Sequence, residues 1–244
     1  MTPIHADSEQ RHDTEARGDK LPFPSVPEAL LAQARIAIER TRVGRSTQSL
    51  IVVGQPSWVS DTLQGVTALA GELDGVVVRA DASTGASLPA LLSPALAAAL
   101  HSLKTHEKAL PLVERTERGL AGFTAALQAK FPDLARLDGP TEPGLADNGD
   151  LEFDLAALLE SAGQAARAAR SMLVLVVDGL HHLELVDLGA LIAGLHRCAQ
   201  STLPVLLIGG GEPALRARAA KAKSYAERSL VFIECESPSA TQLR

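Results

Sequence analysis

Short aliphatic and β-branched runs alternate with longer segments rich in Ala and Leu from residue 28 onwards. The runs are strand-length and almost continuously apolar, which is typical of parallel strands buried on both faces. The predicted strands are residues 50–53, 75–80, 172–177, 203–208 and 230–233. The predicted helices are residues 28–42, 61–73, 88–103, 106–130, 151–170, 184–199 and 213–229. This alternation predicts an α/β fold in which helices cover both faces of a five-stranded parallel sheet.

Two segments lack this pattern. Residues 1–27 mix charged residues with several prolines and show no periodicity, so we expect a disordered N-terminal lead-in. Residues 133–150 contain two prolines and three glycines and are predicted to form a long loop between helices. The folded domain is therefore expected to be residues 28–244.

Composition narrows the class of protein. The chain has 46% hydrophobic residues, enough for a sizeable core, but a net charge of −6, which gives no overall basic field for nucleic acid. Its two cysteines are too few for a disulfide framework. The N-terminus lacks the apolar stretch of a signal peptide, and the longest apolar runs are far too short to span a membrane. We expect a soluble, cytoplasmic protein without a membrane partner.

The segment after the first predicted strand stands where a phosphate-binding P-loop would stand, with the pattern G-x-x-x-x-G-K-S/T. Gly54 matches the first glycine, whereas Val59 occupies the position of the second glycine and Ser60 that of the lysine. Asp61 replaces the hydroxyl residue that binds Mg²⁺, and Thr62 would supply a hydroxyl only if the loop shifted by one residue. A phosphate cradle needs converging backbone N–H groups and positive charge, so these departures predict a failed motif.

The third predicted strand runs directly into Asp178. An apolar strand that ends in Asp is the arrangement in which a P-loop ATPase holds Mg²⁺. The residue that follows in an active ATPase is usually Glu, which polarises the attacking water, but here it is Gly179. An alternative interpretation is that Asp178 only caps a turn.

Six short stretches carry a resemblance to a known family. They read ARIAIER (34–40), GRS (44–46), QSL (48–50), PGLADNGDLEFDL (143–155), LPV (203–205) and AKSYAER (222–228). Together they resemble bacterial ATP-binding proteins with an origin-recognition-type AAA ATPase domain, a branch of the P-loop NTPase superfamily, over roughly residues 30–238. The resemblance implies binding of ATP and Mg²⁺ through the P-loop and an Asp-Glu pair. Of those residues only Gly54 and Asp178 survive in this chain.

The resemblance also implies a helical lid over the nucleotide and a DNA-binding-like tail. This sequence ends at Arg244, so we expect an AAA-type core without the lid and with uncovered apolar surface. That surface would serve an unidentified protein partner or self-association, and DNA is a further partner implied by the resemblance.

Three functions follow as expectations. The first is a degenerate AAA-type domain that does not hydrolyse ATP and acts as an interaction module, and so is not an enzyme. The second is an ATP-binding protein that retains weak nucleotide binding through Gly54 and Asp178. The third is a truncated product without a function of its own.

Two rival sites follow other strands. Gly209, Gly210 and Gly211 precede the last predicted helix in a G-x-G-x-x-A pattern, with Glu234 at the spacing of a dinucleotide-binding fingerprint. A glycine-rich turn explains the same residues. The second rival is a metal site at Asp178 with the histidines His181, His182 and His196, for which a solvated turn is the alternative. The basic residues of 212–229 fit either a solvated helix face or an acidic partner.

Overall fold

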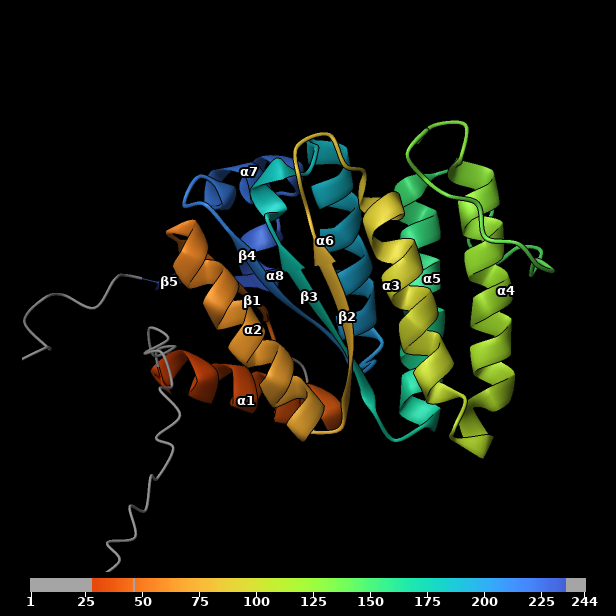
Figure 1. The fold of residues 1–244 in the computed structure, drawn as a ribbon, viewed down its shortest axis with the longest axis horizontal. Coiled ribbons are helices and arrows are strands. Elements are labelled where there is room, and N and C mark those ends of the chain that lie inside the picture. The colour runs from red at the N-terminus through yellow and green to blue at the C-terminus, as the bar shows by residue number, and fades with distance from the viewer. Residues whose placement is uncertain (1–27, 46, 236–244) are drawn as a thin grey trace, which may run out of the picture.

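The protein is built on one five-stranded parallel sheet, seen in a computed structural model that describes residues 28–45 and 47–235. The predicted lead-in, residues 1–27, lies outside the described residues. The strands lie in the order β2-β3-β4-β1-β5, and every neighbouring pair is parallel. Their bounds are β1 Ser49–Gly54, β2 Gly75–Asp81, β3 Met172–Asp178, β4 Val205–Gly211 and β5 Leu230–Cys235. In Figure 1 the carboxyl ends of the strands point upward.

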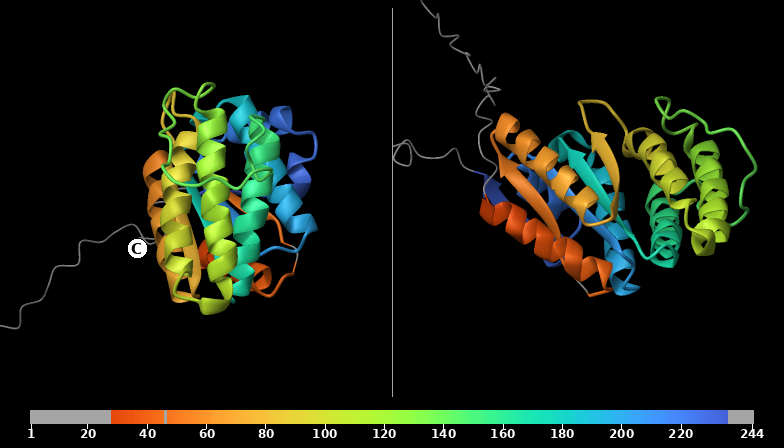
Figure 2. Two further views of the ribbon diagram at one scale, coloured as in Figure 1. Left: turned by 90° about the vertical axis from the view of Figure 1, so that its right-hand side faces the viewer. Right: turned by 60° about the horizontal axis from the view of Figure 1, so that its bottom comes forward.

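Helices cover both faces of the sheet, so the domain has three layers (Figure 1). Helices α1 and α2 lie on one face and α3, α5 and α6 on the other, while α4 packs against α3 and α5 (Figure 2, left). The helices are α1 Glu28–Arg42, α2 Pro56–Glu72, α3 Leu88–Leu103, α4 Leu110–Leu127, α5 Leu151–Ala168, α6 Leu185–Gln200, α7 Leu215–Ala222 and α8 Ala226–Ser229. Among the described helices, none combines the length and the apolar character needed to cross a membrane.

Strict alternation along the central strands creates two separate cores. Ile51 and Val53 of β1 face the larger core beneath α3, α5 and α6, whereas Leu50 and Val52 face the smaller core beneath α1 and α2. Successive side chains of a strand point to opposite faces, so an uninterrupted apolar strand supplies both cores. The predicted α/β class with a doubly covered parallel sheet is confirmed.

The predicted elements differ from the observed ones mainly at helix ends. The helix predicted for residues 213–229 is two helices, α7 and α8, because residues 223–225 leave the helical conformation between them. Helix α2 begins at Pro56 and not at residue 61 as predicted. Proline fits the first helical turn, where its fixed φ is favourable and its missing N–H is not needed. This earlier start changes the candidate site.

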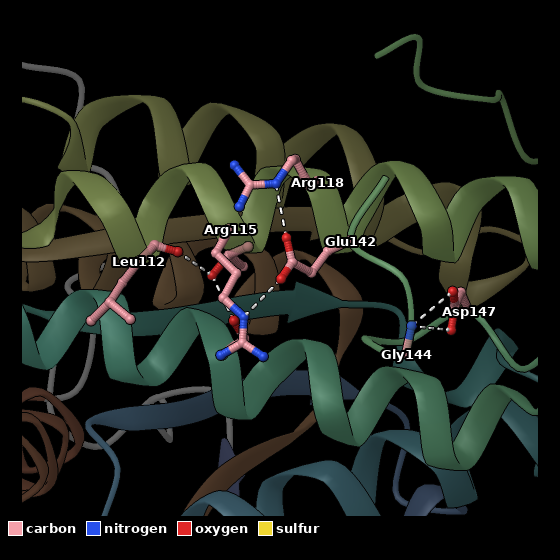
Figure 3. Close-up of polar contacts among 8 residues, drawn as sticks. Leu112, Arg115, Arg118, Glu142, Gly144 and Asp147 are labelled. Atoms are coloured by element: carbon pink, nitrogen blue, oxygen red, sulfur yellow. Dashed lines mark hydrogen bonds and ion pairs between the residues drawn. The ribbon is translucent and has the colours of Figure 1, made fainter. Parts of the chain in front are cut away.

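The predicted loop at residues 133–150 is confirmed, and it lies across α4 (Figure 3). Arg118 Nε donates to Glu142 Oε2 at 2.9 Å, and Arg115 Nε lies 3.4 Å from Glu142 Oε1. The hydrogen bond from Arg118 holds the pKa of the Glu142 carboxyl below its ordinary value. Farther along the loop, both carboxylate oxygens of Asp147 accept from the backbone N–H of Gly144.

The end of this loop is fixed by a buried carboxylate at the start of α5. Asp154 is fully buried and accepts hydrogen bonds from the backbone N–H groups of Asn148 and Gly149, at 3.2 and 2.8 Å. Burial raises the pKa of Asp154 above its ordinary value. Carboxylates therefore hold the long connection at its middle and at its C-terminal end.

Candidate functional site

The carboxyl edge of the sheet brings Ser60 and Asp178 together from α2 and β3. Ser60 Oγ donates to Asp178 Oδ2 at 2.5 Å, and the Gly179 backbone N–H donates to Asp178 Oδ1 at 2.7 Å. Gly179 has a φ of 69°, in the left-handed region that favours glycine, so the chain turns sharply after β3. Both oxygens of the carboxylate thus already have donors within the chain.

The predicted phosphate-binding loop is not a loop. Only Gln55 separates the end of β1 from Pro56, the first residue of α2, and the backbone N–H of Val59 donates to the Gln55 carbonyl oxygen. None of residues 54–62 has a positive φ. A P-loop needs several backbone N–H groups to converge on the anion from a glycine-rich turn. Here those residues form the first turns of a helix, so the expectation of a loop before residue 61 was wrong.

Val59 occupies the space over a glycine of the neighbouring strand. A Cβ atom placed on Gly210 would overlap the Val59 side chain and lie 2.7 Å from Leu63 Cδ1 and 3.0 Å from Asp178 Oδ1. Val59 is buried, with 1% of its surface exposed. The sequence interpretation missed this contact. The glycine run in β4 was the available signal, because a strand segment without side chains lets neighbouring side chains pack closely onto it.

Gly54 and Thr62 face the edge strand β5. A Cβ atom on Gly54 would clash with the carbonyl oxygen of Cys235, the residue paired with it across the two strands. Thr62 is buried, and its Oγ1 lies 3.7 Å from Cys235 Sγ, whereas Asp61 is half-buried. Close packing against β5 therefore accounts for the glycine at position 54.

Trp58 lies one residue before Val59 and is partly buried against the smaller core beneath α1 and α2. Val59 takes the place over β4, and Trp58 packs to the side of it.

The glycine run does not form the turn of a dinucleotide fingerprint. Gly209, Gly210 and Gly211 are the last three residues of β4, and none has a positive φ. A Cβ atom on Gly209 would overlap Leu180, and one on Gly211 would lie 2.9 Å from Leu215 Cδ2. The run is glycine because neighbouring side chains pack onto the strand, and α7 begins only at Leu215.

The histidines of the second rival site are not brought together. His181 and His182 lie beside each other at the carboxyl edge, with ring centroids 3.9 Å apart, while His196 lies against Tyr225 at the opposite edge. His181 Nδ1 accepts from the backbone N–H of Glu212, and burial lowers the His181 pKa. Within residues 28–45 and 47–235, no three His, Cys, Asp or Glu side chains form a metal-binding group.

Comparison with known proteins identifies a shared fold. The chain aligns with a crystal structure of Cdc6p from Pyrobaculum aerophilum, with a TM-score of 0.51 and 11% identity over 88% of this chain. The fold is P-loop NTPase-like. The alignment spans 47% of the Cdc6p chain, about half of its length. Drosophila ORC bound to poly(dA/dT) DNA and Cdc6 aligns with a TM-score of 0.46 and 14% identity, over 99% of this chain and 38% of that one. No protein-family model and no curated protein matches the sequence.

The contact between Ser60 and Asp178 should contribute measurably to stability within this P-loop NTPase-like fold. We expect a coupling free energy of about 1.5–3 kcal/mol between Ser60→Ala and Asp178→Ala, because the hydrogen bond is short and has a charged acceptor. Urea denaturation of the two single variants and the double variant measures this coupling. Ser57→Ala, on the exposed side of the same helix, is the matched control and should show no coupling with Asp178→Ala. A coupling near zero for Ser60 would mean that the pair is not formed in solution.

Proposed function

We propose that this chain is a degenerate AAA-type domain that does not hydrolyse ATP and acts by binding a protein partner. The observation that carries the proposal is that both carboxylate oxygens of Asp178 accept hydrogen bonds from the chain itself. In the family that the sequence resembles, this carboxylate would hold Mg²⁺, but here it accepts hydrogen bonds from the Ser60 hydroxyl and from the Gly179 backbone N–H. Each oxygen of Asp178 has a second lone pair, so a magnesium ion would have to share this carboxylate with the Ser60 hydroxyl and the Gly179 backbone.

Several further features of the site support the same function. The lysine that would meet the outer phosphates is replaced by Ser60, and the half-buried Asp61 adds a negative charge close by. Two like charges ~4 Å apart repel by about 4 kcal/mol at an effective dielectric constant of ~20. The space over β4 is taken by Val59, and Gly179 stands where the water-polarising Glu would be. Each feature opposes a different step of nucleotide binding or hydrolysis.

The second candidate function is weak nucleotide binding through Gly54 and Asp178. One observation favours it, since Asp178 ends β3 at the carboxyl edge and is not fully buried. Ligands of open α/β sheets bind beyond the carboxyl ends of the strands. DNA as a partner and a cytoplasmic location remain expectations, the first from the family resemblance and the second from the sequence.

We expect no binding of Mg·ATP by the purified chain at concentrations up to roughly 1 mM, and no hydrolysis. The physical reasons are the lack of a cradle of N–H groups and of the lysine, and the negative charge of Asp61 close by. Titration calorimetry with and without Mg²⁺ tests binding, and phosphate release over hours tests hydrolysis. Asp178→Ala is the control, because turnover that depends on Asp178 would refute the proposal. Binding without turnover would favour the second candidate instead.

A further inference from the structure

A groove lined by arginines runs along the amino edge of the sheet, opposite the candidate nucleotide site. It consists of three depressions, of about 440, 20 and 610 Å³. The first and the middle depressions share Thr47, Ala199 and Val205, and the middle and the last share Gly44 and Thr202, so the three are continuous. We call this surface the amino-edge groove. Figure 2, right, turns this lower edge of the molecule towards the viewer, with α1 beneath the sheet.

The charge of this groove is opposite to that of the whole chain. Its lining contains the six arginines Arg40, Arg42, Arg45, Arg167, Arg170 and Arg228, and no lining residue is Asp or Glu. The complete chain has a net charge of −6. A concentration of positive charge in a concave surface raises the local potential and attracts anionic ligands.

Most of these guanidinium groups are available to a ligand. Arg42 donates to the Leu73 carbonyl oxygen at 2.9 Å and lies 3.8 Å from Asp74. For the other positions, no carboxylate of the described residues lies within ion-pair distance of Arg45, Arg167, Arg170 or Arg228. The groove therefore holds positive charge that the described part of the fold does not neutralise.

Helix dipoles explain part of this arrangement but not all of it. Arg40, Arg42 and Arg167 lie in the last turns of α1 and α5, where positive side chains are favourable. That effect acts on each helix separately. It accounts neither for the hollow between the helices nor for the exclusion of acidic residues from all three depressions.

A hydrogen-bonding group without a partner lies in the middle of the groove. The Thr41 hydroxyl oxygen is buried and has no hydrogen-bond partner among the described residues, and Thr41 lines the middle depression. Buried polar groups are normally paired with protein or water. The depression of about 20 Å³ beside Thr41 is large enough for one water molecule, through which a ligand could satisfy the hydroxyl.

We propose that the amino-edge groove binds an extended acidic peptide segment of a partner protein. Guanidinium groups form paired hydrogen bonds with carboxylates, and the continuous course of the groove suits a chain more than a compact molecule. A single nucleic-acid strand gains much of its affinity by stacking bases on aromatic side chains, and no Phe, Tyr or Trp lines the groove. The His196 ring, which does line it, already packs against Tyr225 at a centroid distance of 4.9 Å.

A short fluorescein-labelled poly-glutamate peptide is the probe. A labelled poly-thymidylate strand of equal charge is titrated separately and represents single-stranded nucleic acid. Fluorescence anisotropy should show binding of the peptide that weakens as ionic strength rises towards about 0.15 M. The variant Arg45→Gln, Arg170→Gln and Arg228→Gln removes one charge from each depression and should weaken binding about tenfold.

The matched control removes the same number of charges from exposed positions outside the groove, through Lys108→Gln, Arg136→Gln and Lys221→Gln. It should retain wild-type affinity. Equal losses in the two triple variants, or no binding of the peptide at low salt, would overturn the proposal. Tighter binding of the poly-thymidylate strand than of the peptide would overturn it in favour of nucleic acid. If circular dichroism shows that the groove variant is unfolded, Arg228→Gln is tested alone. NMR chemical-shift changes of the wild-type protein on addition of the peptide then locate the contact. Shifts away from the groove would also overturn it.

Discussion

Replacing Gly54 with alanine is expected to destabilise the domain by about 2–3 kcal/mol. The new Cβ would clash with the carbonyl oxygen of Cys235, and because this is a backbone atom, strands β1 and β5 would have to separate to relieve the clash. Thermal or urea denaturation measures the effect. Gly54 is the residue that best matches a phosphate-binding motif, but the packing explanation requires this cost without any nucleotide.

Gly71→Ala is the matched control for this substitution. A Cβ atom on Gly71 meets nothing within 4 Å, and the residue lies in the last turn of α2. Alanine favours the helix over glycine by about 0.5–1 kcal/mol, so this variant should be as stable as the wild type or slightly more stable. If Gly54→Ala behaved in the same way, the packing explanation would be wrong and the glycine at position 54 would need another reason.

The second large effect is expected from restoring the missing motif residues. The triple variant Val59→Gly, Ser60→Lys and Asp61→Thr should lose at least about 3 kcal/mol of stability, before counting the lost hydrogen bond from Ser60 to Asp178, and gain no Mg·ATP affinity. Removing the buried Val59 side chain costs about 0.8 kcal/mol per carbon, and glycine within a helix costs about 1 kcal/mol more. The helix that begins at Pro56 still leaves only Gln55 between strand and helix, so no cradle forms. Calorimetry and urea denaturation measure the two effects.

The double variant Ser60→Lys and Asp61→Thr, which keeps Val59, is the control for the stability loss. It should lose less stability than the triple variant, because it gives up the hydrogen bond from Ser60 to Asp178 but keeps Val59, the only fully buried side chain of the three. Magnesium-dependent ATP binding by the folded triple variant would contradict the expectation. It would show that the side chains at positions 59–61 prevent nucleotide binding, and that the start of α2 at Pro56 does not.

The architecture could be predicted because apolar periodicity reports burial directly. The five strands are almost continuously apolar, and the observed strands extend the predicted ones by only one or two residues at most ends. Helix starts were harder, because Pro56 and the residues after it read equally well as a loop when a P-loop is expected at that position.

The candidate site was harder to predict because its contacts join distant segments. Departure from the motif could be read at Val59, Ser60 and Asp61, but the hydrogen bond between Ser60 and Asp178 joins residues 118 positions apart. The arginines of the amino-edge groove were missed for the same reason. They come from the ends of α1 and α5 and from α8, which are scattered in sequence and meet only because parallel strands begin at one edge. Arginines that follow predicted helices were the available signal.

The hydrogen bond from Ser60 to Asp178 also bears on how the protein could be regulated. A ligand that binds only the native state stabilises it by an amount that grows with the ligand concentration. In this chain the Ser60 hydroxyl, covalently attached and always present, takes the place of such a ligand at the Asp178 carboxylate. On our proposal the folded state therefore has no linkage to the cellular ratio of ATP to ADP. Occupancy of the domain by a partner would then follow partner concentration and ionic strength alone, as in a constitutive scaffold and not in a timed switch.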